Sequence, residues 1–207
     1  SPLEIIKIYG LDPLRYYLVK EVSFGSDGNI SIDKLANCIN SDLANNFGNL
    51  CQRVTAFIEK NCSGLVPKFD KFDADDLKIL NNFSENINQL RINMNNQNLN
   101  FYINFIIDSL FETNKYFNDQ EPWKKKSDPK RLNTILFVAL EIIRKVSILL
   151  FPIIPESAIK ALQIFNLTEK DIVLNSIIDH EYLTVNSKIN KIGILFKKIE
   201  KIEKNDD

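Results

Sequence analysis

Two small groups of side chains have the types and the spacing needed to hold a nucleic-acid base. Asn49 and Arg53 lie four residues apart in "NFGNLCQR", so they project from the same face of a helix. Trp123, the only tryptophan, follows Pro122 in the polar stretch "QEPWKKKSDPKR". Bases of single-stranded RNA are bound by stacking on aromatic planes and by hydrogen bonds to their Watson–Crick edges. These side chains predict that chemistry.

Positive side chains around Trp123 could neutralise phosphates. The segment 119–131 has five positive residues against three negative ones, so its basic bias is local and modest. Simpler alternatives stay open at this point. Asn49 could be merely solvated, Arg53 could form a surface ion pair, and Trp123 could pack over a helix junction beside solvated lysines. The possible phosphate contacts are Lys124, Lys125, Lys126, Lys130 and Arg131.

No residue pattern predicts a catalytic centre or a metal site. A hydrolase or transferase needs a nucleophile with a base, a metal cluster or a phosphate-binding loop. The only histidine, His180, lies in an irregular stretch without a nearby cysteine, and "FGSDGN" lacks the spacing of a Walker loop. Cys38, Cys51 and Cys62 are 13 and 11 residues apart, which matches neither a zinc motif nor a disulfide framework. We therefore expect no catalytic residue and no metal ligand, and a binding or scaffolding role instead.

Composition indicates a globular cytoplasmic protein. Hydrophobic residues make up 44% and charged residues 26% of the 207 residues, enough for one large or two small cores. The formal net charge of −1 gives no global field for nucleic acid or an anionic membrane, and we expect neither DNA nor a membrane as a partner. The most apolar stretch carries Glu141, Arg144 and Lys145 at its middle, which argues against a membrane span. Reduced thiols fit the cytoplasm, and the absence of an initial methionine indicates a piece of a longer polypeptide.

Helical periodicity predicts an all-α fold. Apolar residues recur at three- and four-residue steps along four long segments with short joints, which indicates an antiparallel helix bundle. Two short helices precede it: the first stops at Gly10, and the second begins with Asp12 as N-cap and Pro13 at its first helical position. The long segments are expected at about 31–61, 73–95, 98–118 and 128–150, with a tight turn at 23–29, a short helix at 154–165, an irregular stretch at 166–187 and an amphipathic tail helix at 190–207.

Several blocks of the sequence resemble one known family. "YGLDPLRYYLVKEVSFGSDGNISIDKLANCINSDLANNFGNLCQR" looks like the segment that follows the Lys-Met-Ser-Lys-Ser loop in bacterial methionyl-tRNA synthetases. "EPWKKK", "RLNTILFVALEIIRKVSILLFPIIP" and "LFKKIEK" resemble later blocks of the same family, in the same order. That family usually has Pro and Arg before the final Ile-Glu, where this sequence has Lys197 and Lys198. The resemblance covers nearly the whole chain.

The resemblance implies the tRNA-binding portion of a class I methionine-tRNA ligase. In that family an Asn and an Arg four apart, and a Trp after Pro, bind the CAU anticodon and chiefly its first base. They match Asn49, Arg53, Pro122 and Trp123. The His-Ile-Gly-His and Lys-Met-Ser-Lys-Ser signatures of the catalytic half are not in this sequence. The implied partners are methionine tRNA and the chain's own catalytic domain. ATP and Mg²⁺ would be used only by the full-length enzyme, and this piece alone should be inactive.

The resemblance also implies a domain organisation. Residues 1–30 would be a stem-contact connector, 31–165 an anticodon-binding bundle of the class I synthetase type, and 166–207 a C-terminal extension with a tail helix. Two alternatives remain: the anticodon domain of another class I synthetase, and a helical protein-interaction scaffold without RNA affinity. If Arg53 and Trp123 lay on opposite sides of the bundle, the RNA hypothesis would lose its site.

Overall fold

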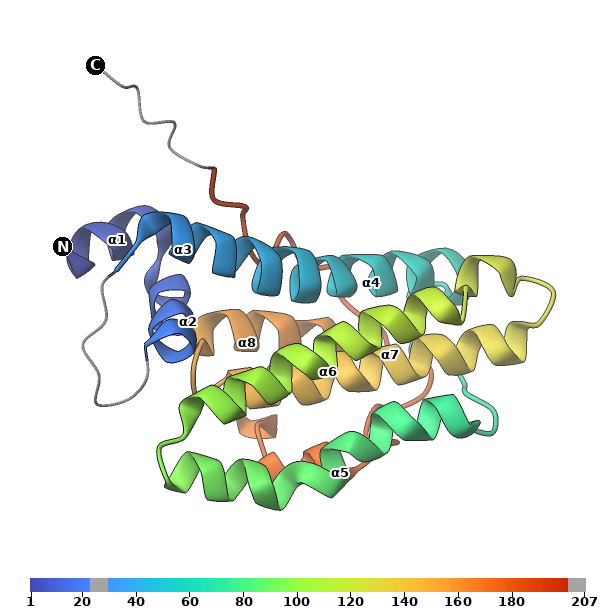
Figure 1. The fold of residues 1–207 in the computed structure, drawn as a ribbon. Coiled ribbons are helices and arrows are strands. Elements are labelled where there is room, and N and C mark those ends of the chain that lie inside the picture. Colours follow the sequence, from blue (N-terminus) through green and yellow to red (C-terminus); the bar gives the residue numbers. More distant parts are fainter. Residues whose placement is uncertain (23–29, 201–207) are drawn as a thin grey trace.

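The computed structural model describes residues 1–22 and 30–200, and in them the fold is all α-helical, as predicted (Figure 1). The tight turn predicted at 23–29 lies outside the described residues. The elements are α1 (Pro2–Tyr9), α2 (Leu11–Glu21), α3 (Ile32–Cys38), the π-helix η1 (Ile39–Gly48), α4 (Asn49–Cys62), α5 (Ala74–Asn95), α6 (Leu99–Asp119), the 3-10 helix η2 (Pro122–Lys124), α7 (Pro129–Leu150), α8 (Pro155–Leu162) and the 3-10 helices η3 (Gln163–Phe165), η4 (Glu169–Asp171) and η5 (Leu174–Ile178).

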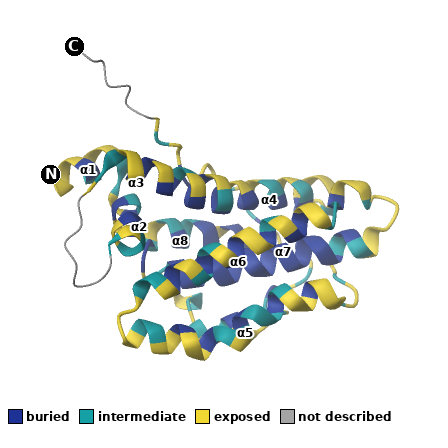
Figure 2. Cartoon of the chain, viewed as in Figure 1, coloured by how far each residue is buried: buried dark blue, intermediate teal, exposed yellow. Residues whose placement is uncertain are grey.

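The long helices form the predicted antiparallel bundle, with α7 at its centre. α7 contacts α4, α5, α6 and α8, and Figure 2 shows it buried along almost its whole length. The sequence explains this position, because α7 itself carries apolar side chains on every face from Leu132 to Leu150. The neighbouring helices each bury one stripe and leave their outer face exposed (Figure 2). The core therefore lies around α7.

The first long helical unit runs without a break from Ile32 to Cys62, close to the predicted range, but its middle is a π-helix. In this π segment, Ile39–Gly48, the Asp42 carboxylate accepts hydrogen bonds from Tyr16 and Lys20 of α2. The wider turn thus coincides with the joint between the first two helices and the bundle. Apolar spacing of three and four residues did not reveal it.

The prediction that Asp12 caps α2 is wrong. α2 begins directly after Gly10, whose φ of 95° lets the chain turn between α1 and α2. Asp12 is buried, and its Oδ2 accepts a hydrogen bond from the backbone N–H of Ser157 at 2.7 Å. Arg15 supports the same joint by donating to the carbonyl of Ile153 at 2.6 Å. The carboxylate therefore caps the first turn of α8 instead of its own helix.

The predicted tail helix is also wrong over its described part. Residues 190–200, here called the tail strap, form no helix. Asn40 fixes the strap by two hydrogen bonds to one residue. Its side-chain amide donates to the carbonyl of Ile199 (2.9 Å) and accepts from the N–H of Ile199 (2.8 Å). Phe196 is buried beside Phe47, with ring centroids 6.2 Å apart. The strap thus buries single apolar side chains against the first long helix.

The irregular segment after α8 is held by the charged residues in the middle of α7. Arg144 pairs with Glu141 at 2.8 Å and donates to two backbone carbonyls of the segment, at 3.0 and 3.3 Å. Lys145 donates to a third carbonyl at 2.6 Å and lies 3.2 Å from the Nδ1 of His180. Arg144 and Lys145 are both fully buried. Their charged groups thus find hydrogen-bond acceptors inside the protein, and they hold the segment against α7.

Protonation of His180 should destabilise this packing. Burial lowers the pKa of His180, whose Nδ1 faces Lys145; burial likewise lowers the pKa of Lys145, to about 7. Below about pH 6.5 the unfolded chain takes up a proton that the folded His180 resists. The free energy of unfolding, measured by urea denaturation, should therefore fall between about pH 7.5 and about pH 5.5.

The matched variant is His180→Gln, which keeps a polar side chain and removes the titration. Carboxylates with ordinary pKa values near about 4 change little over this range, so they add little to the expected decrease. The decrease should be smaller in the variant than in the natural chain. An equal decrease in both would contradict a role for His180.

Candidate nucleic-acid interface

Trp123 stands at the α6–α7 junction with part of its ring in solvent. After α6 ends, Glu121 adopts a left-handed conformation with φ of 45° and turns the chain into η2. Pro122 is buried and anchors this turn, whereas Trp123 is 40% exposed. A ring that is fixed by a buried neighbour and partly open to solvent can stack on an unpaired base.

Arg53 lies at the same end of the bundle. Its guanidinium donates to the Oδ1 of Asn118 at 2.7 Å and lies over the Phe117 ring, 5.1 Å from the centroid. Asn118 is five residues before Trp123, and Figure 1 shows the end of α4 beside the α6–α7 junction. The two predicted groups are therefore not on opposite sides of the bundle. Within the described residues Arg53 pairs with no carboxylate, so its charge remains available to a ligand.

Asn49 lies one helical turn before Arg53 on α4, with its side chain exposed. It borders a groove of about 320 Å³ between the first long helix and the tail strap, which Gln52 also lines. Within the described part of the chain its amide makes no hydrogen bond. One donor group and one acceptor group of Asn49 are therefore free for a bound molecule.

The predicted phosphate contacts differ in how free they are. Three of the five pair with carboxylates of the chain itself, which reduces the positive charge they offer. Lys125 and Lys126 have no carboxylate partner among the described residues. The pairs are Lys124 with Glu121 (2.7 Å), Lys130 with Asp70 (3.5 Å), and Arg131 with Asp73 (3.0 Å) and Asp76 (2.6 Å).

Arg131 has a role other than the predicted phosphate contact, because it joins three helices behind Trp123. Asp76, in the first turn of α5, is fully buried and accepts hydrogen bonds from Arg131 of α7 and Tyr116 of α6. Burial alone would raise the pKa of Asp76, but the hydrogen bonds from Arg131 and Tyr116 outweigh it and hold this pKa below its usual value. The same guanidinium donates to Gln120, at the start of the turn, at 2.8 Å.

Two cysteines and the histidine are held inside the described fold. Burial raises the pKa of Cys38 to about 12 and also raises that of Cys51, so neither is a thiolate at neutral pH. His180 is bound between Lys145 and Asn81. In the described ranges, no group of three or more His, Cys, Asp or Glu residues could hold a metal ion. None of the described helices combines the length and the apolar character needed to cross a bilayer.

Comparisons with known proteins identify the class. Residues 1–55, which include Asn49 and Arg53, match the family model described as tRNA synthetases class I (M), and this match indicates the class I aminoacyl-tRNA synthetases. Residues 66–207, more than half of the chain, match the family model described as the anticodon binding domain of methionyl tRNA ligase. The chain therefore belongs to the methionyl-tRNA ligase family and contains its anticodon-binding domain.

Individual relatives agree with this assignment. The methionine-tRNA ligase of Brucella suis is 43% identical over 165 residues, which are 79% of this chain and 32% of that protein. The ligase of Rickettsia conorii is 36% identical over 204 residues, covering 97% of this chain and 40% of that protein. The apo crystal structure of Mycobacterium tuberculosis methionyl-tRNA synthetase superimposes with a TM-score of 0.90 at 29% identity, over 98% of this chain and 41% of the other. The chain thus spans well under half the length of these relatives.

Sequence reasoning missed the residues that position the site. Asn118 holds Arg53 from 65 residues away, and no spacing within the sequence marks that pair. Asp76 carries a partial signal, since its side chain completes a capping box with Asp73 at the start of α5. The capping box predicts where α5 begins, but it does not predict the ion pair between Asp76 and Arg131.

Replacing Arg131 should cost far more stability than replacing Lys124. Arg131→Met leaves the fully buried Asp76 without its counterion, so we expect the free energy of unfolding to fall by about 3–5 kcal/mol. Lys124→Met breaks an exposed pair with Glu121 and should change it by less than about 1 kcal/mol. Urea denaturation at neutral pH measures both variants. Similar losses in the two would contradict the internal role of Arg131.

Proposed function

We propose that this chain binds the CAU anticodon of methionine tRNA. Membership of the anticodon-binding family supports tRNA as the partner. The observation that favours a specific site is the hydrogen bond of Arg53, one turn after Asn49 on α4, to Asn118 at the end of α6, five residues before Trp123. This end of the bundle is distant along the first long helix from α1 and α2 (Figure 1).

The longer polypeptide to which this chain corresponds would attach methionine to that tRNA in a reaction that uses ATP and Mg²⁺. The relatives from Brucella suis and Rickettsia conorii carry the name methionine-tRNA ligase, and this chain covers 32% and 40% of their lengths. We assign the chemical step to the remaining part, because among the described residues Cys38 and Cys51 are buried and His180 is bound to Asn81. The role of this chain is then to select the tRNA.

Arg53 is suited to the acceptors on the Watson–Crick edge of the first anticodon base, a cytosine. Its guanidinium has five N–H donors, and Asn118 accepts from one nitrogen only. Phe117 lies under the guanidinium plane and limits its movement. Asn49, one turn earlier on the same face, can accept from the exocyclic amine or donate to an acceptor. Arg53 thus offers an oriented, unneutralised donor set.

Trp123 supplies the stacking plane. Its exposed fraction of 40% leaves room for a base, while the buried Pro122 keeps the ring in place without a ligand. Lys125 and Lys126 follow directly and are free of carboxylate partners among the described residues, so they are the phosphate contacts of this turn that remain plausible.

Removing the Trp123 ring should weaken RNA binding without unfolding the chain. Trp123→Ala should lose about 1–3 kcal/mol of binding free energy to a CAU stem-loop RNA, because one base loses its stacking partner. Trp123→Phe should keep most of the affinity. Fluorescence anisotropy with this RNA, and with one whose first anticodon base is changed, measures both affinity and selectivity.

Three results of that experiment would count against the proposal. Equal affinity for the two RNAs would contradict anticodon recognition. An unfolded Trp123→Ala variant would show that the ring serves packing. A natural chain that binds neither RNA would favour a helical scaffold for protein partners.

Changing Asn118 should affect selectivity through Arg53. Asn118→Ala removes the acceptor that orients the guanidinium, so discrimination at the first anticodon base should fall more than overall affinity. Asn118→Asp should lower affinity further, because a carboxylate would compete with the base for the guanidinium. The same two RNAs provide the measurement. If both variants bound the two RNAs with the affinities of the natural chain, a positioning role for Asn118 would be excluded.

A further inference from the structure

The groove beside Asn49 continues the candidate interface along the first long helix. The polar residues that line it, here called its rim, are Asn49, Gln52, Lys197 and Lys198. Among the described residues, no carboxylate lines it. Within the described residues, Lys197 and Lys198 are exposed and form no ion pair. The rim therefore consists of hydrogen-bonding groups with uncompensated positive charge.

The floor of the groove is apolar. Phe196 is buried there, and Ile194 is 59% exposed beside it. Gly48 lies under the strap, and a Cβ atom at that position would be in ordinary van der Waals contact with the Phe196 ring, at 3.7 Å. The groove of about 320 Å³ thus combines an apolar floor with a cationic rim.

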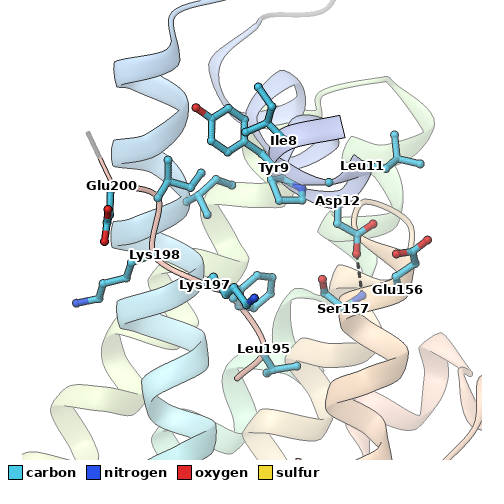
Figure 3. A pocket seen from close by; sticks show the side chains of 15 residues that line it. Ile8, Tyr9, Leu11, Asp12, Glu156, Ser157, Leu195, Lys197, Lys198 and Glu200 are labelled. Carbon is cyan, nitrogen blue, oxygen red and sulfur yellow. Dashed lines mark hydrogen bonds between the residues drawn. The ribbon is translucent and has the colours of Figure 1, made fainter. Parts of the chain in front are cut away.

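The larger cleft on the other side of the strap has a different charge. The larger cleft of about 640 Å³ between α1, α2, α8 and the strap is lined by Asp12, Glu156 and Glu200 as well as by the two lysines. Figure 3 shows Asp12 and Glu156 on the wall formed by α2 and α8, with Lys198 extending away from them. These carboxylates would repel a phosphate. The groove beside Asn49 is free of them.

The strap is fixed, so the groove has a defined shape. The Asn40 amide holds Ile199 by two hydrogen bonds, and Lys160 donates to the carbonyl of Ile194 at 3.0 Å. These contacts lie on either side of Lys197 and Lys198. Both lysines therefore project from a backbone that is held on both sides.

We propose that this groove is a second nucleotide subsite, in which Lys197 and Lys198 bind a phosphate of the RNA and the apolar floor supports a base or ribose. The inference rests on the proposed function, because its ligand is the loop of the same RNA. A nucleotide joins an apolar ring to an anionic phosphate, and the groove presents complementary surfaces in one place. Its position next to Asn49 makes it the site for a neighbour of the first anticodon base.

The test removes the two charges. Lys197→Gln combined with Lys198→Gln should lower affinity for the CAU stem-loop severalfold and make the plot of log affinity against log salt shallower by about 0.7–1.4, as for one or two lost phosphate contacts. Selectivity at the first anticodon base should stay. The matched control replaces Lys170 and Lys188, two exposed lysines that do not line the groove, and should leave the salt slope unchanged.

A neutral linkage in the RNA locates the phosphate. A methylphosphonate beside the first anticodon base should weaken binding to the natural chain and cause little further loss in the double-lysine variant. Asn40→Ala, which frees the strap at Ile199, should reproduce the loss seen on removing the charges. If the methylphosphonate and the two lysine substitutions lowered the affinity independently, so that their losses added, the proposed subsite would be wrong.

The outcomes separate this inference from the proposed function. If the double-lysine variant keeps the natural affinity and salt slope while Trp123→Ala still loses affinity, the subsite is wrong and anticodon binding stands. If the base change and Trp123→Ala both have no effect, the proposed function fails, and the subsite fails with it.

Discussion

The ion pair between Asp76 and Arg131 holds the end of the bundle on which the candidate site is built. It links the start of α5, the start of α7 and, through Tyr116, the end of α6. Burying two charges is costly unless their hydrogen bonds are well satisfied, and here the carboxylate also accepts from the N–H of Asp73. Apolar side chains could bring the helix ends together. They would not fix the direction in which the chain leaves α6.

That direction decides which side chains reach the surface. Pro122 is drawn inward and Trp123 is left partly open, because Glu121 accepts the strained left-handed conformation required by the turn. Arg53 comes from a distant part of the sequence and is brought to the same place by Asn118. A binding surface of this kind is assembled by the helix ends, and each helix contributes only one or two of its residues.

The sequence predicted the long helices well because burial of a continuous apolar stripe leaves few alternatives. The central place of α7 was not predicted, although its apolar residues on all faces are typical of a buried helix. The errors arose where local signals compete with tertiary contacts. Asp12 looks like an N-cap, yet the start of α8 takes its carboxylate. The tail repeats apolar residues at three- and four-residue steps as an amphipathic helix does, but a non-helical chain held by Asn40 also buries Phe196.

The residues of the candidate site were likewise predictable only where the signal is local in the sequence. Asn49, Arg53 and Trp123 could be named from spacing and family resemblance, because they belong to short motifs. The neighbouring sequence did not show which Lys and Arg side chains are paired with carboxylates and which are unpaired. Arg131 has its carboxylate partner 55 residues away, whereas Lys125, a few residues before it, has none in the described part of the chain. Pairing over such separations is a property of the fold.

The tail strap has a consequence for the order of folding during synthesis. Residues 194–200 leave the ribosome after every helix that they cover, and domains generally fold as the chain emerges from its N-terminal side. The helices can collapse around α7 before Asn40 and Ile199 meet. The wall of the groove beside Asn49 is then the last part of the described surface to form. A nascent chain would have Arg53 and Trp123 in place while this wall is still missing.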